Sequence, residues 1–433
     1  MGPGGRGPSR QRVVVAIAGH GTAGTASEPA ARRGAPAADV RSCGVAVVRV
    51  VLLLVGSATA LLPVRRVPGW ILVLALGVGA TAAGVVPWHV AREATGDLAP
   101  ALAFLLVAVP LAIELDETGF FAALAARAGA GRHLLPALWI LAAATTIVFN
   151  LDAAVVLLTP LYVRIAVGQG RDVVHLAVIP ALLASLASSV LPVSNLTNLI
   201  AAERLDLSTG SFLTHLALPS ALAIVVGGWL HLRAAPAPRP VCDRAEPIAP
   251  GALRVGIPVV VWLLAGFTVG DRWGVPAWVV AGVALAALVV HRRHVPWRHL
   301  PVGAAGLALG LGLLAAGAAP HLPVDDVLGI GGRGGTAVAA LASAAAANAV
   351  NNLPALLVAL PALDAHPDRV WAVLAGVNVG PTLWVTGALS TMLWQATMRR
   401  LGHEVSARTY ARHGVRVGLP ALALVIAVLA LGA

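Results

Sequence analysis

The sequence predicts an all-α polytopic membrane protein made of two inverted-topology repeats, each with about five transmembrane helices, a re-entrant hairpin and a broken helix at the midplane. Composition is the first observation behind this fold class. The 433 residues are 58% hydrophobic and 11% charged, whereas soluble chains carry about 25% charged residues. The order of the apolar runs is the second observation. Both halves of the sequence consist of three apolar spans, a hairpin and two further spans. The arginines lie in short loops with no aromatic-basic surface, so no nucleic-acid partner is expected.

The first repeat is expected over residues 43–232. Its apolar runs cover about 44–62, 69–90, 98–113, the hairpin at 134–167, 173–202 and 212–232. Residues 1–42 are rich in Gly, Pro, Ala and Arg, which predicts a disordered tail. A misassigned start codon would also account for this segment.

The second repeat is expected over residues 254–433, after a Pro- and Arg-rich linker at 233–253. Its runs cover about 254–270, 275–290, 302–319, an Ala-rich hairpin at 336–362, 370–394 and 415–432. An odd number of spans per half makes the second half enter the membrane from the opposite side, as in secondary transporters. The linker and the loops on its side hold most loop arginines, which predicts a cytoplasmic linker.

The first hairpin is organised around Asn150-Leu151-Asp152, a polar break in an apolar stretch. Each flank is shorter than the ~20 residues of a spanning helix, so the chain is expected to turn back there. A carboxylate at such depth costs ~2.5–3.5 kcal/mol, which makes Asp152 a functional candidate; the alternative is a simple helix cap. Because desolvation disfavours the charged form, Asp152 can load and release a proton, although the following helix N-terminus favours the anion.

Three further breaks accompany this tip. The second hairpin repeats the Asn, Ala and Pro positions of 150–160 at 351–361, and the spans 173–202 and 370–394 are each interrupted by helix-disfavouring residues. Discontinuous helices at corresponding positions of two halves indicate a transport site, whereas the alternative is polar side chains that join neighbouring helices. The candidate substrate- or ion-binding residues are Asn150, Asp152, Ser194, Asn195, Thr197, Asn198, Asn348, Asn351, Asn352, Asn378, Thr382 and Thr386.

An acidic cluster follows the third span. Glu114, Asp116 and Glu117 lie within four residues. Such a cluster at a span end forms a solvated face or, as the functional alternative, a proton relay that feeds Asp152. These three residues and Asp152 are therefore the proton relay candidates.

Several site types are not expected. Cys43 and Cys242 are isolated, so they form neither a metal site nor a disulfide framework. Residues 331–335 lack the Lys-Ser/Thr ending of a phosphate-binding loop, which argues against ATP hydrolysis within the chain. No spacing typical of catalytic residues lies within the spans, and His133, His175 and His215 are interpreted as interfacial. No enzyme activity, catalytic residue, metal or cofactor is expected.

Four segments resemble the arsenical pump membrane proteins, which are arsenite/antimonite exporters of the ion transporter superfamily. They are 149–160, 194–198, 348–354 and 378–394, and residues 115–121 are similar to the family's acidic segment after the third span. The resemblance covers about 45–432. The chain departs from the family at the first tip, where Leu151 separates Asn150 from Asp152.

This resemblance implies a plasma-membrane helical bundle in which two hairpins meet two broken helices. It also implies a homodimer with a scaffold part and a moving part and, for some relatives, a separate cytosolic ATPase subunit. The implied activity is proton-coupled efflux of arsenite or antimonite. Asn amides supply donors and acceptors for the uncharged trihydroxide, and no Arg lies at any break. A sodium/proton antiporter and a citrate/dicarboxylate-type anion transporter remain the alternatives.

Overall fold

The protein is described here by a computed structural model that covers residues 40–61, 67–127, 133–237 and 251–432. Residues 1–39 of the predicted tail and most of the linker fall outside these ranges, whereas residues 40–42 begin the first helix. The described residues form helices joined by short connections and contain no β-strand, which confirms the all-helical fold class. Six segments are long and apolar enough to cross a membrane: Trp88–Asp116, Leu151–Gly168, Thr209–Arg233, Ala252–Val269, Trp297–His321 and Ala407–Gly432.

The elements occur in the same order in both halves of the chain. The first half contains α1 (Val40–Leu61), α2 (Gly69–Ala82), α3 (Trp88–Asp116), α4 (Phe120–Arg127), α5 (Leu134–Phe149), α6 (Leu151–Gly168), α7 (Val173–Leu186), α8 (Leu196–Arg204) and α9 (Thr209–Arg233). The second contains α10 (Ala252–Val269), α11 (Ala277–Arg292), α12 (Val302–Ala318), α13 (Val324–Leu328), α14 (Gly332–Val350), α15 (Asn352–Leu363), α16 (Val370–Val379), α17 (Leu389–Arg400) and α18 (Ala407–Gly432).

The contacts between the halves are reciprocal. α2 packs on α12 while α11 packs on α3, and α9 packs on α18. This pattern is the one expected of a two-fold relation between the halves, in which the second helix of each half meets the third helix of the other. The inverted orientation of the halves across the membrane stays a prediction.

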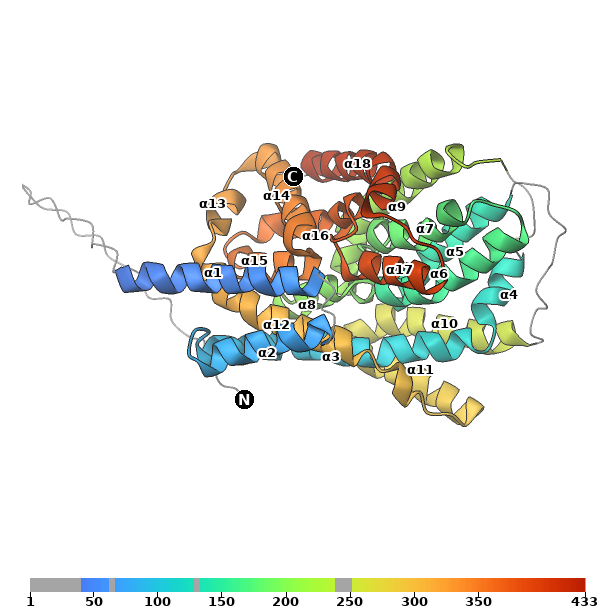
Figure 1. Cartoon of the computed structure of the whole chain (residues 1–433), viewed down its shortest axis with the longest axis horizontal. Coiled ribbons are helices and arrows are strands. Elements are labelled where there is room, and N and C mark those ends of the chain that lie inside the picture. Colours follow the sequence, from blue (N-terminus) through green and yellow to red (C-terminus); the bar gives the residue numbers. More distant parts are fainter. Residues whose placement is uncertain (1–39, 62–66, 128–132, 238–250, 433) are drawn as a thin grey trace, which may run out of the picture.

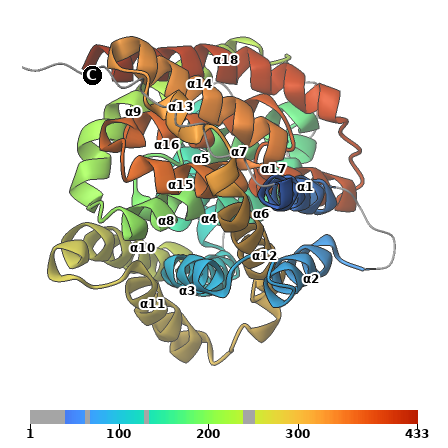
Figure 2. The ribbon, with the colours of Figure 1, turned by 90° about the vertical axis from the view of Figure 1, so that its left-hand side faces the viewer.

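The helices are arranged in two parts. In Figure 2, α2, α3, α10, α11 and α12 form a layer below the hairpins and broken helices. Figure 1 shows the same layer lengthwise, with α3 beneath the segments that contain the polar breaks. α3 and α12 contact both parts, since α3 also packs on α6 and α8 and α12 on α15. The polar breaks therefore face a surface built from these two helices.

Both hairpins turn at an asparagine. α5 ends at Phe149, directly before Asn150, and α14 ends at Val350, directly before Asn351. The second arm of the first hairpin is α6, which ends at Gly168, one residue beyond the predicted end of the hairpin at 167. At 18 residues it is about 27 Å long, close to the ~30 Å hydrocarbon thickness. The re-entrant path of this hairpin stays a prediction.

Candidate functional site

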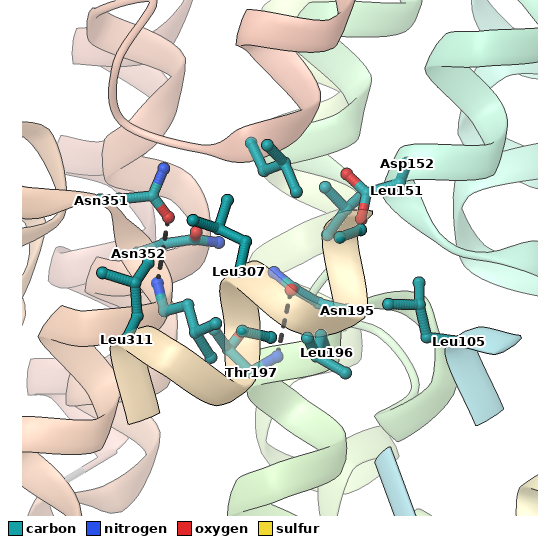
Figure 3. A pocket seen from close by; sticks show the side chains of 14 residues that line it. Leu105, Leu151, Asp152, Asn195, Leu196, Thr197, Leu307, Leu311, Asn351 and Asn352 are labelled. Carbon is teal, nitrogen blue, oxygen red and sulfur yellow. Dashed lines mark hydrogen bonds between the residues drawn. The ribbon is translucent and has the colours of Figure 1, made fainter. Parts of the chain in front are cut away.

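A small cavity lies where the two hairpin tips and the first broken helix meet α3 and α12 (Figure 3). Its volume is about 40 Å³, against the about 10–15 Å³ that one ordered water requires. Five polar residues line it: Asp152, Asn195, Thr197, Asn351 and Asn352. The remaining lining is apolar and comes from Leu105, Leu151, Leu196, Ala304, Leu307, Ala308, Leu311, Leu353 and Leu389. None of these lining residues carries a positive charge.

The hairpin tips are built by asparagines at positive φ. Asn150 has φ 126° and ψ 154°, and Asn351 has φ 86° and ψ 152°, a combination that is adopted almost only by glycine, so the backbone at both tips is strained. Each side-chain carbonyl then accepts a hydrogen bond from the backbone N–H two residues later. The distances are 2.6 Å from Asp152 N to Asn150 Oδ1 and 3.3 Å from Leu353 N to Asn351 Oδ1. Both asparagines thus end one helix and cap the next.

Asn195 repeats this arrangement at the first broken helix. Its Oδ1 accepts a hydrogen bond of 3.2 Å from Thr197 N and caps α8. The first residues of α6, α8, α15 and α17 all line the cavity. Four helix N-termini therefore converge there, and each favours an anion or an oxygen lone pair. In Figure 3, Asn351 and Asn352 lie on one side and Asp152 on the other, with Asn195 between them.

Asn378 of α16 joins the two broken helices. Its Oδ1 accepts hydrogen bonds from Asn195 Nδ2 at 2.8 Å and from Thr197 Oγ1 at 3.0 Å. Its Nδ2 donates to Asn198 Oδ1 at 2.6 Å. Asn198 in turn donates to the main-chain oxygens of the break, Ser188 and Leu191. This network fixes the first break and so positions two of the five polar lining residues.

Each hairpin is also tied to the broken helix of its own half. Ser194 Oγ donates to Ile147 O in α5 at 2.8 Å. In the second half, Asn348 Nδ2 donates to Gly380 O at 2.9 Å, and Thr386 Oγ1 donates to Asn348 O at 3.3 Å. The second tip has two more bonds to the break, from Asn352 N to Gly387 O and from Asn351 Nδ2 to Thr386 O. Hydrogen bonds therefore join the hairpin to the break in each half.

Four buried polar atoms of the predicted binding residues have no hydrogen-bond partner. They are Asn150 Nδ2, Asp152 Oδ1, Asn348 Oδ1 and Thr382 Oγ1. Buried polar atoms are nearly always paired, so each such exception needs an explanation. Among the residues with described side chains, no cation pairs with the Asp152 carboxylate. Asp152 therefore lines the cavity and has a buried carboxylate oxygen without a hydrogen-bond partner.

The acidic cluster lies apart from the cavity. Glu114 is 0% exposed and forms ion pairs with Arg292 and His294, while Glu117 pairs with Arg292 at 2.6 Å. Glu114 follows the cavity residue Leu105 by nine positions, or about 13 Å along α3. Asp116 is half-buried. Glu114 thus connects α3 to α11 and does not lie on a solvated face; its relay role stays a prediction.

The polar part of the cavity lining is predicted by the sequence. Of the predicted binding residues, Asp152, Asn195, Thr197, Asn351 and Asn352 line the cavity. Six of the others act as caps or form connecting hydrogen bonds around it: Asn150, Ser194, Asn198, Asn348, Asn378 and Thr386. Thr382 lies in the second break, and its buried Oγ1 has no hydrogen-bond partner. The wall from α3 and α12 was missed, because Leu and Ala in an apolar span give no signal that separates a cavity wall from a lipid face.

Comparison with known proteins identifies the family. Residues 45–390 match the family model described as citrate transporter. The chain belongs to this transporter family. It is also 30% identical over 399 residues to the arsenical pump membrane protein of Escherichia coli (strain K12), with 83% of this chain and 91% of the relative covered. The protein of the same description from Yersinia enterocolitica is 29% identical over 398 residues, again with 83% and 91% covered.

A solved structure shows the same fold. The crystal structure of the Alcanivorax borkumensis YdaH transporter, reported to have an unusual topology, aligns with a TM-score of 0.51 and 15% identity. The alignment covers 89% of this chain and 98% of that one. The relatives from Escherichia coli and Yersinia enterocolitica confirm the resemblance to arsenical pump membrane proteins. This citrate transporter family member is a multi-pass plasma-membrane transporter and is not an enzyme.

Proposed function

We propose that this family member exports trivalent arsenic or antimony in exchange for protons. The observation that carries the proposal is the cavity itself, which is small and lacks positive charge, and whose polar lining consists of three amides, one hydroxyl and one carboxylate. Its 30% identical relative is described as an arsenical pump membrane protein. At neutral pH the arsenic(III) trihydroxide is uncharged, so it needs hydrogen-bond donors and acceptors from the protein and no counter-ion.

The size and charge of the cavity favour this cargo over citrate. About 40 Å³ is enough for a small uncharged molecule with a few hydroxyl groups. A tricarboxylate is several times larger and would place its charges beside Asp152 without an arginine to pair them. The helix N-termini at the cavity provide only partial positive charge. The citrate/dicarboxylate alternative therefore has less support.

Coupling follows from competition for the Asp152 carboxylate. The deprotonated group accepts hydrogen bonds from substrate hydroxyls, and its Oδ1 has no protein partner that would have to leave first. Protonation converts one of its oxygens into a donor and removes acceptor capacity. A proton arriving from outside then displaces the substrate, and a substrate arriving from inside displaces the proton. Such exclusive occupancy is what exchange requires.

A sodium/proton antiporter is the second candidate. The same free carboxylate oxygen, with the Asn carbonyls nearby, provides the hard oxygen ligands that a small cation prefers. Sodium and proton would then compete for Asp152 in place of the trihydroxide. The homodimer and the separate cytosolic ATPase subunit stay predictions of the family resemblance.

Expression in an arsenite-sensitive host without its own exporter distinguishes these candidates. The parent protein is expected to restore growth on arsenite, and everted vesicles are expected to accumulate arsenite when a proton gradient is imposed. Asp152→Asn, at equal membrane abundance, is the matched control and should do neither. Failure of the parent to confer resistance, together with sodium- or citrate-dependent flux in the same vesicles, would refute the proposal.

A further inference from the structure

Three histidines from three helices meet at a place separate from the cavity. His175 lies in the first turn of α7, His231 in the last turn of α9 and His413 near the start of α18. Each has a ring nitrogen within 4.8 Å of those of the other two. His175 and His231 are 3% and 1% exposed, and His413 is half-buried. None of them lines the cavity.

The hydrogen bonds of this cluster leave ring nitrogens available as ligands. His231 Nε2 lies 3.1 Å from the main-chain oxygen of His175 and therefore donates to it. Metal-binding histidines typically donate their second ring N–H to such an acceptor, which fixes the tautomer. Nδ1 of His231 then carries a lone pair. His175 Nε2 is buried and has no hydrogen-bond partner. A bound ion would give this buried nitrogen a partner.

From these contacts we propose that His175, His231 and His413 bind a divalent transition metal ion such as Zn²⁺. Three imidazoles and a water are a familiar ligand set for Zn²⁺. Nitrogen ligands alone disfavour Mg²⁺ and Ca²⁺, which prefer oxygen. The wide separation of the three residues in the sequence explains why no spacing motif predicts this site.

The rings must reorient when the ion binds. His175 and His231 are stacked, with centroids 4.0 Å apart and planes inclined by 8°. Lone pairs lie in the ring planes, so two parallel rings cannot direct theirs to one ion. His413 is inclined at 58° and 50° to the other two. Binding therefore turns one stacked ring and draws the nitrogens inward, until each is about 2.0–2.1 Å from Zn²⁺.

Charged residues around the three histidines affect how strongly the cluster attracts a cation. Arg171, Arg412 and Arg416 oppose a cation there, and Asp172 attracts one. The Asp172 carboxylate is held in place because it accepts a hydrogen bond of 2.7 Å from His175 N. The arginines weaken purely electrostatic attraction, so binding depends on coordination by the imidazoles. An occupied site would tie α7, which leads to the break at Asn195, to the packed pair of α9 and α18.

Co²⁺ titration of the full-length protein tests the proposal, with a purification tag that contains no histidine. The parent is expected to bind one Co²⁺ per chain with the visible absorption of a four-coordinate ion. His413→Ala should weaken binding at least about tenfold. His89→Ala, which removes an exposed histidine at the start of α3, should leave it unchanged. Zn²⁺ should also raise the Tm of the parent, because a ligand of the folded state stabilises it, and not that of His413→Ala.

Two outcomes would overturn the proposal. If the parent and His413→Ala bind Co²⁺ with equal affinity, the ion is held elsewhere. If the parent binds no Co²⁺ and its Tm is unmoved by Zn²⁺, the three histidines only pack together. His413→Gln serves as the second variant should His413→Ala fail to fold, and metal-free Tm values establish that each variant is intact. None of these measurements depends on which substrate the cavity transports.

Discussion

Nδ2 of Asn195 lies 2.8 Å from Oδ1 of Asn378, and this hydrogen bond joins the broken helix of one half to the broken helix of the other. Asn195 also caps α8 and lines the cavity. The geometry of the cavity therefore depends on a residue, Asn378, that does not line it. If the two halves separate at this point, this hydrogen bond must break.

Asn378→Ala is expected to lower stability and transport together. The change removes three side-chain hydrogen bonds, to Asn195, Thr197 and Asn198. At roughly 0.6 kcal/mol for each bond between membrane helices, the loss is about 2 kcal/mol. The Tm of the purified protein is the measurement. Thr268→Ala is the control, because the Thr268 hydroxyl bonds only within its own helix; equal Tm values for both variants would contradict the prediction.

The sequence predicted the local parts of this site and missed the long-range ones. Asn150 and Asn351 could be recognised because a polar break and a cap are properties of neighbouring residues. The bond from Asn195 to Asn378 connects positions far apart in the chain, and no pattern in the sequence pairs them. Likewise the sequence shows that carboxylates lie at the end of α3, but not which residue pairs with them. The position of Arg292 beside Glu114 follows only from the packing of α11 on α3.

Glu114→Gln is expected to destabilise the contact between α3 and α11. Glu114 is fully buried, whereas the side chain of Arg292 is 24% exposed. Breaking a buried ion pair costs about 3–5 kcal/mol, and partial exposure of the partner reduces this to about 1–3 kcal/mol. A lower Tm than that of Glu404→Gln, which changes an exposed carboxylate, would support the prediction. If Glu114 also relays protons, the pH dependence of transport shifts; an unaltered profile leaves only the structural role.

The linker around Cys242, which lies outside the described residues, is expected to be cytoplasmic. The loops on its side carry most of the arginines, whereas the opposite loops carry one each. In a Cys43→Ser background, a membrane-impermeant maleimide should label Cys242 only after the cells are opened. Ready labelling of intact cells would reverse the orientation of every span.

Asn195→Ala and Asn351→Ala are expected to weaken apparent substrate affinity while coupling persists. Both amides line the cavity, and loss of one hydrogen bond of about 1.4 kcal/mol corresponds to about a tenfold change. Asn351→Gly is the matched variant, because glycine adopts the positive φ of this position without strain. If Asn351→Gly keeps parental affinity while Asn351→Ala loses it, the amide serves only the backbone turn. Concentration dependence of arsenite uptake into everted vesicles supplies the measurement.

Asp152→Asn is expected to abolish proton-coupled accumulation while folding and membrane insertion are preserved. The amide keeps the size of the side chain and its ability to hydrogen-bond, and removes titration. The Asn150 cap is unaffected, since Asn150 Oδ1 accepts its bond from the backbone N–H of residue 152. Substrate exchange down a gradient should therefore persist, and uphill transport driven by a proton gradient should not. Asp326→Asn, at an exposed position on α13, is the control for loss of a carboxylate elsewhere. Uphill arsenite transport by Asp152→Asn at the parental rate would show that Asp152 contributes only to the start of α6, and proton coupling would then have to reside in another group.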